Sequence, residues 1–197
     1  MTTILLIRHG LTDETGKILS GRSSGLVLNA EGREQAHRLP IMLQNKQIAA
    51  IFSSPLERTI ETAGPLSDMT HLPLILSEDF LEVNFGEWTN RSIEALRNDP
   101  LFIRFNTFRS CTRPPGGELM SEVQLRMIRG LERIQETCSN QTVAIFSHGD
   151  PIRAVIGFYA GIHPDLLGRL EISPASVSTI ELYTDTARII SVNEGSL

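Results

Sequence analysis

Short apolar runs recur along the chain and predict the buried strands of a sheet. Four of them occupy residues 4–7 (ILLI), 48–52 (IAAIF), 72–76 (LPLIL) and 143–146 (VAIF). Continuous hydrophobicity of this kind is typical of strands that are covered on both faces. Amphipathic stretches lie between the runs, which is the pattern of an α/β fold with a mainly parallel sheet. Residues 176–183 (SVSTIELY) and 187–192 (ARIISV) flank a short turn and predict a hairpin that finishes the sheet.

Residues that commonly cap helices mark where the helices between these strands begin. Asn29 can cap a helix that carries its apolar residues on one face and contains Pro40, which is expected to kink the helix or end it early. A second helix start is predicted at Ser54. The serine would cap the helix, Pro55 would take the first helical position, and Glu57 would complete the capping box. Asp150 followed by proline predicts a third start, for a helix that ends near Gly161.

Residues 85–117 do not follow this alternation, and we interpret them as an insertion. They contain five aromatic residues, several arginines and a Pro-Pro-Gly-Gly hinge at 114–117. A long amphipathic helix is predicted after the hinge, running to about Cys138. The aromatic residues at helical spacing, Phe102, Phe105 and Phe108, are expected to pack the insertion.

Composition and charge limit the classes of protein that fit. The chain has 197 residues, of which 41% are hydrophobic and 21% charged, and no apolar run is long enough for a membrane span. With no basic segment or cleavage site at the start, we expect a soluble cytoplasmic protein. Cys111 and Cys138 form no disulfide framework, so reduced thiols are expected. The net charge of −5 predicts no general attraction to nucleic acid.

Basic residues follow three of the predicted parallel strands. Arg8 and His9 follow the first run, Arg58 lies in the first turn of the helix after residues 48–52, and His148 follows residues 143–146. The carboxyl ends of parallel strands share one edge of a sheet, where ligands commonly bind. Helix N-termini at the same edge add positive potential. This arrangement predicts a local anion pocket.

A tetrahedral phosphate fits this pocket best. Gly10 and Gly149 let the backbone approach a ligand closely. Arginine alone suffices for phosphate binding, so two histidines indicate further chemistry. A neutral histidine can attack phosphorus while the arginines hold the equatorial oxygens.

The leaving oxygen would then need a proton donor. Glu82, in the stretch FLEVNFGEW after the next strand, is the carboxylate best placed to supply that proton. Glu78, Asp79 and Glu87 are neighbouring candidates.

Four motifs resemble those of the histidine phosphatase superfamily, phosphoglycerate mutase-like branch, over essentially the whole chain. They are LIRHG, SSPLERTIETA, LEVNFGEW and FSHGDPIRAV. The resemblance implies that His9 is the nucleophile and Glu82 the proton donor, with a phosphate pocket of Arg8, Arg58 and His148. It implies a single three-layer domain over residues 1–197, with a mixed, mainly parallel sheet between helices and residues 85–117 as a small cap. It implies no metal and no cofactor.

The substrate that follows from the resemblance is a small phosphorylated metabolite. The candidates for contacting it are Arg8, Thr12, Gly21, Arg22, Arg58, His148 and Gly149. Leu11 and Gly25 stand where the family commonly has glutamate and aspartate, so the substrate is not identified. The sequence does not determine the oligomeric state of the protein, and it is compatible with a homodimer.

The function we predict is a metal-independent phosphatase that hydrolyses small phosphomonoesters through a phosphohistidine. The short insertion disfavours the first alternative, a phosphoglycerate mutase-type transferase. The second is a non-catalytic module that binds phosphorylated ligands. The remaining basic side chains are expected at the surface: His37, His71, His163, Arg91, Arg104 and Arg109.

Overall fold

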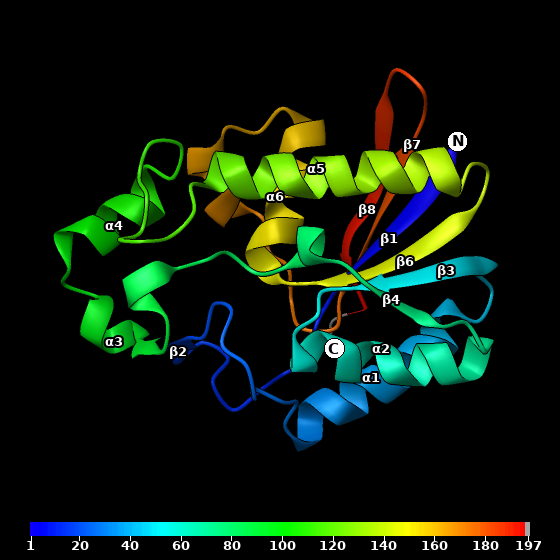
Figure 1. The fold of residues 1–197 in the computed structure, drawn as a ribbon, viewed down its shortest axis with the longest axis horizontal. Helices are drawn as coiled ribbons and strands as arrows, with labels where there is room; N and C mark the ends of the chain where they lie inside the picture. Colours follow the sequence, from blue (N-terminus) through cyan, green and yellow to red (C-terminus); the bar gives the residue numbers. More distant parts are fainter. Residues whose placement is uncertain (196–197) are drawn as a thin grey trace.

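A six-stranded sheet forms the centre of the protein in this computed structural model, which describes residues 1–195 (Figure 1). The strand order is β4-β3-β6-β1-β7-β8. Its strands are β1 (Thr2–Arg8), β3 (Ile48–Ser53), β4 (Leu74–Leu76), β6 (Thr142–Ser147), β7 (Val177–Leu182) and β8 (Ala187–Glu194). The first four run parallel, while β7 and β8 are antiparallel to their neighbours. The predicted mixed, mainly parallel sheet and its terminal hairpin are confirmed.

Helices cover both faces of the sheet, which gives three layers (Figure 1). Leu5 and Ile7 of β1 pack on one face with α1 (Ala30–Leu43) and α2 (Glu57–Thr70). Ile4 and Leu6 point to the other face and pack with α5 (Met120–Thr137) and α6 (Gly149–Ala160). Each buried aliphatic side chain stabilises the fold by roughly 1.5–3 kcal/mol. The residues of the apolar run 4–7 therefore contribute to the cores on both faces of the sheet, as the continuous hydrophobicity of the run predicts.

The prediction of buried strands fails in part at residues 48–52, where Ile51 is buried but Ala49 is exposed. The run at residues 72–76 departs further from it. Its strand, β4, begins only at Leu74 and forms an edge of the sheet. Ile75 and Leu76 are exposed. Pro73 lacks a backbone N–H to donate to a neighbouring strand, which explains the late start.

The helix α1 has Asn29 at its N-cap, as predicted, and ends at Leu43, three residues after Pro40. The starts of two other helices correct sequence-based predictions. The Ser54 capping box is wrong, because α2 begins at Glu57 with Leu56 at the N-cap. The Asp150 cap is also wrong, because α6 begins one residue earlier with His148 at the N-cap. Ser54 and Asp150 are both engaged in long-range contacts, described below, that compete with capping.

Other helix ends agree with the sequence. α5 ends with Cys138 as its C-cap, and α6 ends at Gly161, whose φ of 67° lies in the left-handed region that favours glycine. No helix within residues 1–195 is long and apolar enough to cross a membrane. Cys111 and Cys138 are both free thiols.

Residues 85–117 run beside the sheet and carry α3 (Ile93–Leu96), α4 (Pro100–Thr107) and the short 3₁₀ helix η2 (Gly86–Trp88) (Figure 1). Their strand β5 (Arg91–Ser92) pairs with β2 (Ile18–Leu19), which follows β1 in the chain. Two further 3₁₀ helices, η1 (Glu78–Phe80) and η3 (Pro164–Arg169), lie outside this segment.

Aromatic side chains pack this segment. The rings of Trp88 and Phe105 are both buried and lie edge to face with centroids 5.7 Å apart. Phe102 packs on Trp88 at 5.4 Å, whereas Phe108 is exposed. Packing by Phe102 and Phe105 is thus confirmed, and packing by Phe108 is not.

The N-terminus of α1 lies directly against the backbone that follows β1. A Cβ atom on Gly32 would lie 2.0 Å from the carbonyl oxygen of Leu11, so only glycine fits at this point. The side chain of Asn29 accepts a hydrogen bond from the Gly32 N–H at 2.8 Å and caps the helix there. This contact fixes the loop that leaves β1.

Candidate active site

His9 lies at the carboxyl end of β1 and is almost completely buried. Its Nδ1 lies 2.8 Å from the carbonyl oxygen of Gly10. A carbonyl oxygen can only accept, so Nδ1 carries the proton and the Nε2 of the neutral ring keeps its lone pair. Burial, followed by the charges of Arg58 and Arg8, lowers the pKa of His9 well below its usual value. The ring is therefore neutral, with a defined tautomer and a lone pair on Nε2.

Two arginines flank this ring, each with one hydrogen bond that fixes its position. Arg8 Nη1 donates to the carbonyl oxygen of Ile172 at 2.5 Å, and Arg58 Nη2 donates to that of Gly21 at 2.7 Å. Arg8 Nε and Arg58 Nη1 are buried and have no hydrogen-bond partner among residues 1–195. Buried guanidinium nitrogens without partners are costly, and an anion would satisfy them.

His148 is the second histidine of the site and is fully buried. Its ring lies edge to face with that of His9, with centroids 5.2 Å apart. Its Nε2 contacts the Ser54 hydroxyl at 2.9 Å, while its Nδ1 is buried without a partner in the described part of the chain. Burial, followed by the charge of Arg58, lowers the pKa of His148 well below its usual value.

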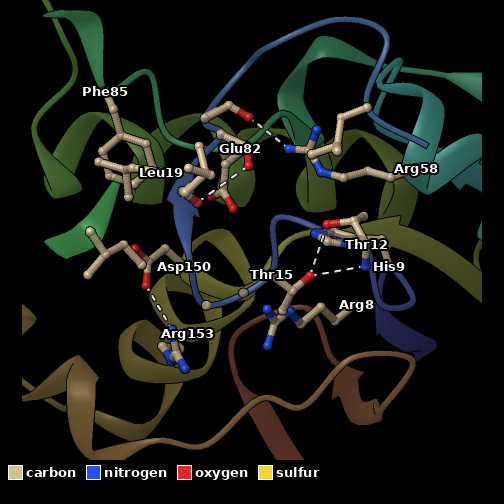
Figure 2. A pocket seen from close by; sticks show the side chains of 17 residues that line it. Arg8, His9, Thr12, Thr15, Leu19, Arg58, Glu82, Phe85, Asp150 and Arg153 are labelled. Atoms are coloured by element: carbon tan, nitrogen blue, oxygen red, sulfur yellow. Dashed lines mark hydrogen bonds and ion pairs between the residues drawn. The ribbon is translucent and has the colours of Figure 1, made fainter. Parts of the chain in front are cut away.

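Glu82 lies on the wall of the same cavity (Figure 2). Burial, followed by the negative charge of Asp150, raises the pKa of Glu82 to about 7. The Val83 N–H, which donates to Glu82 Oε1 at 2.9 Å, opposes this rise without cancelling it. A carboxyl with this pKa still carries a proton over much of the range near pH 7. Glu78, Asp79 and Glu87 do not line this cavity.

A cavity of about 240 Å³ joins these groups. In Figure 2, Arg8, His9 and Arg58 lie along one side of it, whereas Phe85 and Asp150 lie along the other. The apolar part of the wall consists of Ile18, Leu19, Leu26, Phe85 and Ile93. Among residues 1–195, no group of three or more His, Cys, Asp or Glu side chains has the arrangement of a metal site.

The cavity contains seven of the nine residues predicted for the site: Arg8, His9, Thr12, Gly21, Arg58, Glu82 and Gly149. His148 lies outside its lining, beside His9. Thr12 Oγ1 lies 3.0 Å from the hydroxyl of Thr15, another lining residue (Figure 2).

Arg22 is the other predicted residue outside the lining. Its Nε donates to the carbonyl oxygen of Glu82 at 2.9 Å, and its Nη2 forms an ion pair with Glu118 at 2.8 Å. Arg126 Nη2 donates to the same Glu82 carbonyl at 3.0 Å and pairs with the same Glu118. Arg22 therefore holds the backbone of Glu82 instead of pointing into the cavity.

An ion-pair cluster at the cavity was missed by the sequence analysis. Asp150 Oδ1 accepts from Arg109 Nη1 at 2.9 Å and from Arg153 Nη1 at 3.0 Å. Burial alone would raise the pKa of Asp150, but the two guanidinium groups hold it below its usual value. The expectation that Arg109 is a solvated surface residue is wrong. The pair joins positions 41 residues apart, and no local sequence pattern indicates it.

The other basic side chains lie where the sequence analysis expects them. His37, His71, His163, Arg91 and Arg104 are all exposed.

The chain is similar to several known proteins over most of its length. It is 31% identical over 188 residues to the bifunctional protein Rv2228c of Mycobacterium tuberculosis; this match covers 94% of the chain and 52% of that protein. The chain thus spans about half the length of that relative. It is 27% identical over 199 residues to the uncharacterized phosphatase PhoE of Bacillus subtilis, covering 100% and 96% of the two chains.

A solved structure has the same fold. YhfR of Bacillus stearothermophilus superposes with a TM-score of 0.93 at 26% sequence identity, over 100% of this chain and 98% of that one. A family model, that of the histidine phosphatase superfamily (branch 1), matches residues 4–195. By this match over nearly its full length, the chain belongs to the histidine phosphatase superfamily.

Proposed function

We propose that the protein is a metal-independent phosphatase that hydrolyses small phosphomonoesters through a phosphohistidine on His9. One observation carries the proposal. Arg8 Nε, Arg58 Nη1 and His148 Nδ1 are buried nitrogens that find no partner within residues 1–195, and they come from three distant segments around the neutral His9 ring. A phosphoryl group offers acceptor oxygens to all of them.

In the first step, His9 Nε2 forms a bond to phosphorus as the bond from phosphorus to the ester oxygen breaks. Arg8 and Arg58 stabilise the charge on the equatorial oxygens. The leaving oxygen takes its proton from Glu82, whose raised pKa supplies that proton near neutral pH.

In the second step, water attacks the phosphorus of the phosphohistidine. Glu82, now a carboxylate, accepts a proton from the water as the bond from Nε2 to phosphorus breaks. Inorganic phosphate leaves, and His9 and Glu82 return to their starting protonation states. Neither step needs a metal ion.

The residues that line the cavity favour a small substrate. Arg153, the additional cation in the lining, is paired with Asp150 at 3.0 Å, which leaves mainly apolar and hydroxyl groups to contact the rest of the ester. The two free cysteines are consistent with the reduced thiols and cytoplasmic location that we include in the proposal.

The decisive experiment is a panel of phosphate esters assayed in EDTA. We expect release of inorganic phosphate, an acid-labile phosphoenzyme on rapid quenching, and a loss of turnover on the order of 10⁴-fold or more in His9→Ala. His37→Ala, at an exposed histidine of α1, is the matched control.

Three outcomes would contradict the proposal. Activity that EDTA removes and Mg²⁺ restores would exclude the metal-independent mechanism. Transfer of the phosphoryl group to a second substrate, dependent on a bisphosphate primer, would indicate the mutase alternative. Phosphate-ester binding without turnover would indicate a binding module.

A further inference from the structure

The contact between Ser54 and His148 connects two strand ends. Ser54 follows β3 and His148 follows β6, and both residues are fully buried. The Ser54 N–H donates to the Phe146 carbonyl oxygen of β6 at 2.9 Å, and the Ser54 carbonyl oxygen accepts from the Ser53 and Thr59 hydroxyls, each at 2.8 Å. The backbone of Ser54 is therefore fixed. Its side chain is held against the histidine ring.

The hydrogen bonds of the Ser54 hydroxyl indicate its orientation. Its Oγ accepts from the Leu56 N–H at 3.4 Å and lies 2.9 Å from His148 Nε2. If Nε2 carried a proton, Ser54 Oγ would accept two hydrogen bonds and its own proton would be buried without an acceptor. If Nε2 is unprotonated, the hydroxyl donates to it, and both groups are satisfied.

The opposite nitrogen of the ring favours the same assignment. Nδ1 of His148 is buried beside the predicted phosphate site, and no residue that the structure describes is its partner. Burial and the nearby Arg58 keep the ring neutral, because they lower its pKa well below the usual value. A protonated Nδ1 would donate to an anion, whereas an unprotonated Nδ1 would present a lone pair and repel it.

We propose that Ser54 is a positioning residue: its hydroxyl donates to His148 Nε2 and so keeps the ring proton on Nδ1, where it is available to a phosphoryl oxygen. Ser54 touches neither the substrate nor the reacting atoms. It acts by fixing which side of the imidazole is the donor, as partners of metal-bound histidines do. This inference rests on the proposed phosphatase function.

The first experiment identifies the tautomer without measuring activity. Protein labelled with ¹⁵N in its five histidines is studied by long-range ¹H–¹⁵N correlation, with the His148 signals assigned from a His148→Gln sample. We expect Nε2 of His148 to be unprotonated and Nδ1 protonated, and the Nδ1 signal to shift when inorganic phosphate is added. A protonated Nε2 in the wild-type protein would overturn the proposal, even if phosphatase activity is found.

The second experiment tests the consequence for turnover. We expect Ser54→Ala to lower kcat by roughly 10- to 100-fold with little change in KM, because the lost donor acts mainly on the transition state. Ser178→Ala removes a buried hydroxyl of β7 that accepts from the Asn193 N–H and does not contact Ser54, and it serves as the control. Equal losses in both variants would indicate a merely structural role.

A double-mutant cycle completes the test. In a His148→Ala background, Ser54→Ala should cost less than about 2-fold, since the residue through which Ser54 acts is gone. An undiminished loss in that background would overturn the proposal. If Ser54→Ala does not fold, the tautomer measured in the wild-type protein still decides the question.

Discussion

At the scale of single residues, burial reverses the usual order of two pKa values. Free histidine titrates above free glutamate, so a neutral histidine and a protonated glutamate rarely coexist in water. In this site the pKa of His9 lies well below its usual value and that of Glu82 is raised to about 7. Between these two values, both groups are in the protonation states that the proposed first step requires.

The pH dependence of kcat/KM follows from this reversal. We expect an alkaline limb near pH 7, where Glu82 loses its proton, and an acidic limb below the usual histidine range, where His9 gains one. Asp150→Asn should move the alkaline limb to lower pH, because Asp150 raises the pKa of Glu82 and its loss also leaves two guanidinium charges unbalanced. Steady-state rates across pH for both proteins test this. An alkaline limb that does not move would show that it belongs to another group.

The proposed role of Glu82 as the acid predicts a dependence on the leaving group. Glu82→Gln should slow the hydrolysis of alkyl phosphates by a factor on the order of 10² to 10⁴, because an alkoxide needs a proton to depart. Nitrophenolate needs none, so nitrophenyl phosphate should give a burst of about one nitrophenol per active site before slow turnover. Rapid-mixing absorbance measures the burst. Equal slowing of both substrates without a burst would exclude Glu82 as the acid.

Residue-level prediction from sequence succeeds where the backbone alone determines position. Arg8 and His9 end a strand, so the sheet itself carries them to the site. Arg22 does not lie at the end of a strand of the central sheet. Its guanidinium pairs with Glu118, which is 96 residues away and comes near only through tertiary folding. Sequence proximity to the site motifs therefore did not reveal its role.

At the scale of elements, close backbone contact makes α1 part of the support of the site. Gly32→Ala should lower the free energy of unfolding by about 1–3 kcal/mol, since the new Cβ would lie 2.0 Å from the Leu11 carbonyl oxygen and force the helix away from the loop after His9. Gly64→Ala in α2, where a Cβ meets nothing within 4 Å, should instead stabilise by about 0.4–1 kcal/mol. Urea unfolding of both variants provides the comparison, and equal effects would contradict the packing described here.

Helix starts were predicted less well than strands. A buried strand contributes to the cores on both faces of the sheet, and the continuous apolar run that this requires is visible in the sequence. A serine or aspartate that could cap a helix can instead hydrogen-bond to a residue far away in the sequence, and the local sequence does not show that partner. Ser54 contacts His148, and Asp150 binds Arg109, so neither caps the helix that its local sequence predicts.

At the scale of the whole molecule, Arg109 connects residues 85–117 to the sheet-flanking helix α6 through its ion pair with Asp150. Arg109→Met should lower the free energy of unfolding by about 1–3 kcal/mol, because it removes one partner of a buried carboxylate that keeps only Arg153. Arg104→Met, at an exposed arginine of α4, should change it by less than about 0.5 kcal/mol. Thermal and urea denaturation measure both. A similar, small effect of the two substitutions would show that the ion pair does not join the two parts.

The two arginines that donate to the Glu82 carbonyl oxygen have a consequence for the activation entropy of the proposed reaction. The Glu82 carbonyl oxygen accepts from Arg22 and Arg126, and Glu118 holds both guanidinium groups. The segment that carries Glu82 is thus ordered during folding, before any ester arrives. The activation entropy of the proposed phosphoryl transfer then contains no contribution from arranging that segment, so the gain in rate is the same factor at every temperature, and the slope of ln(k/T) against 1/T reports the activation enthalpy alone.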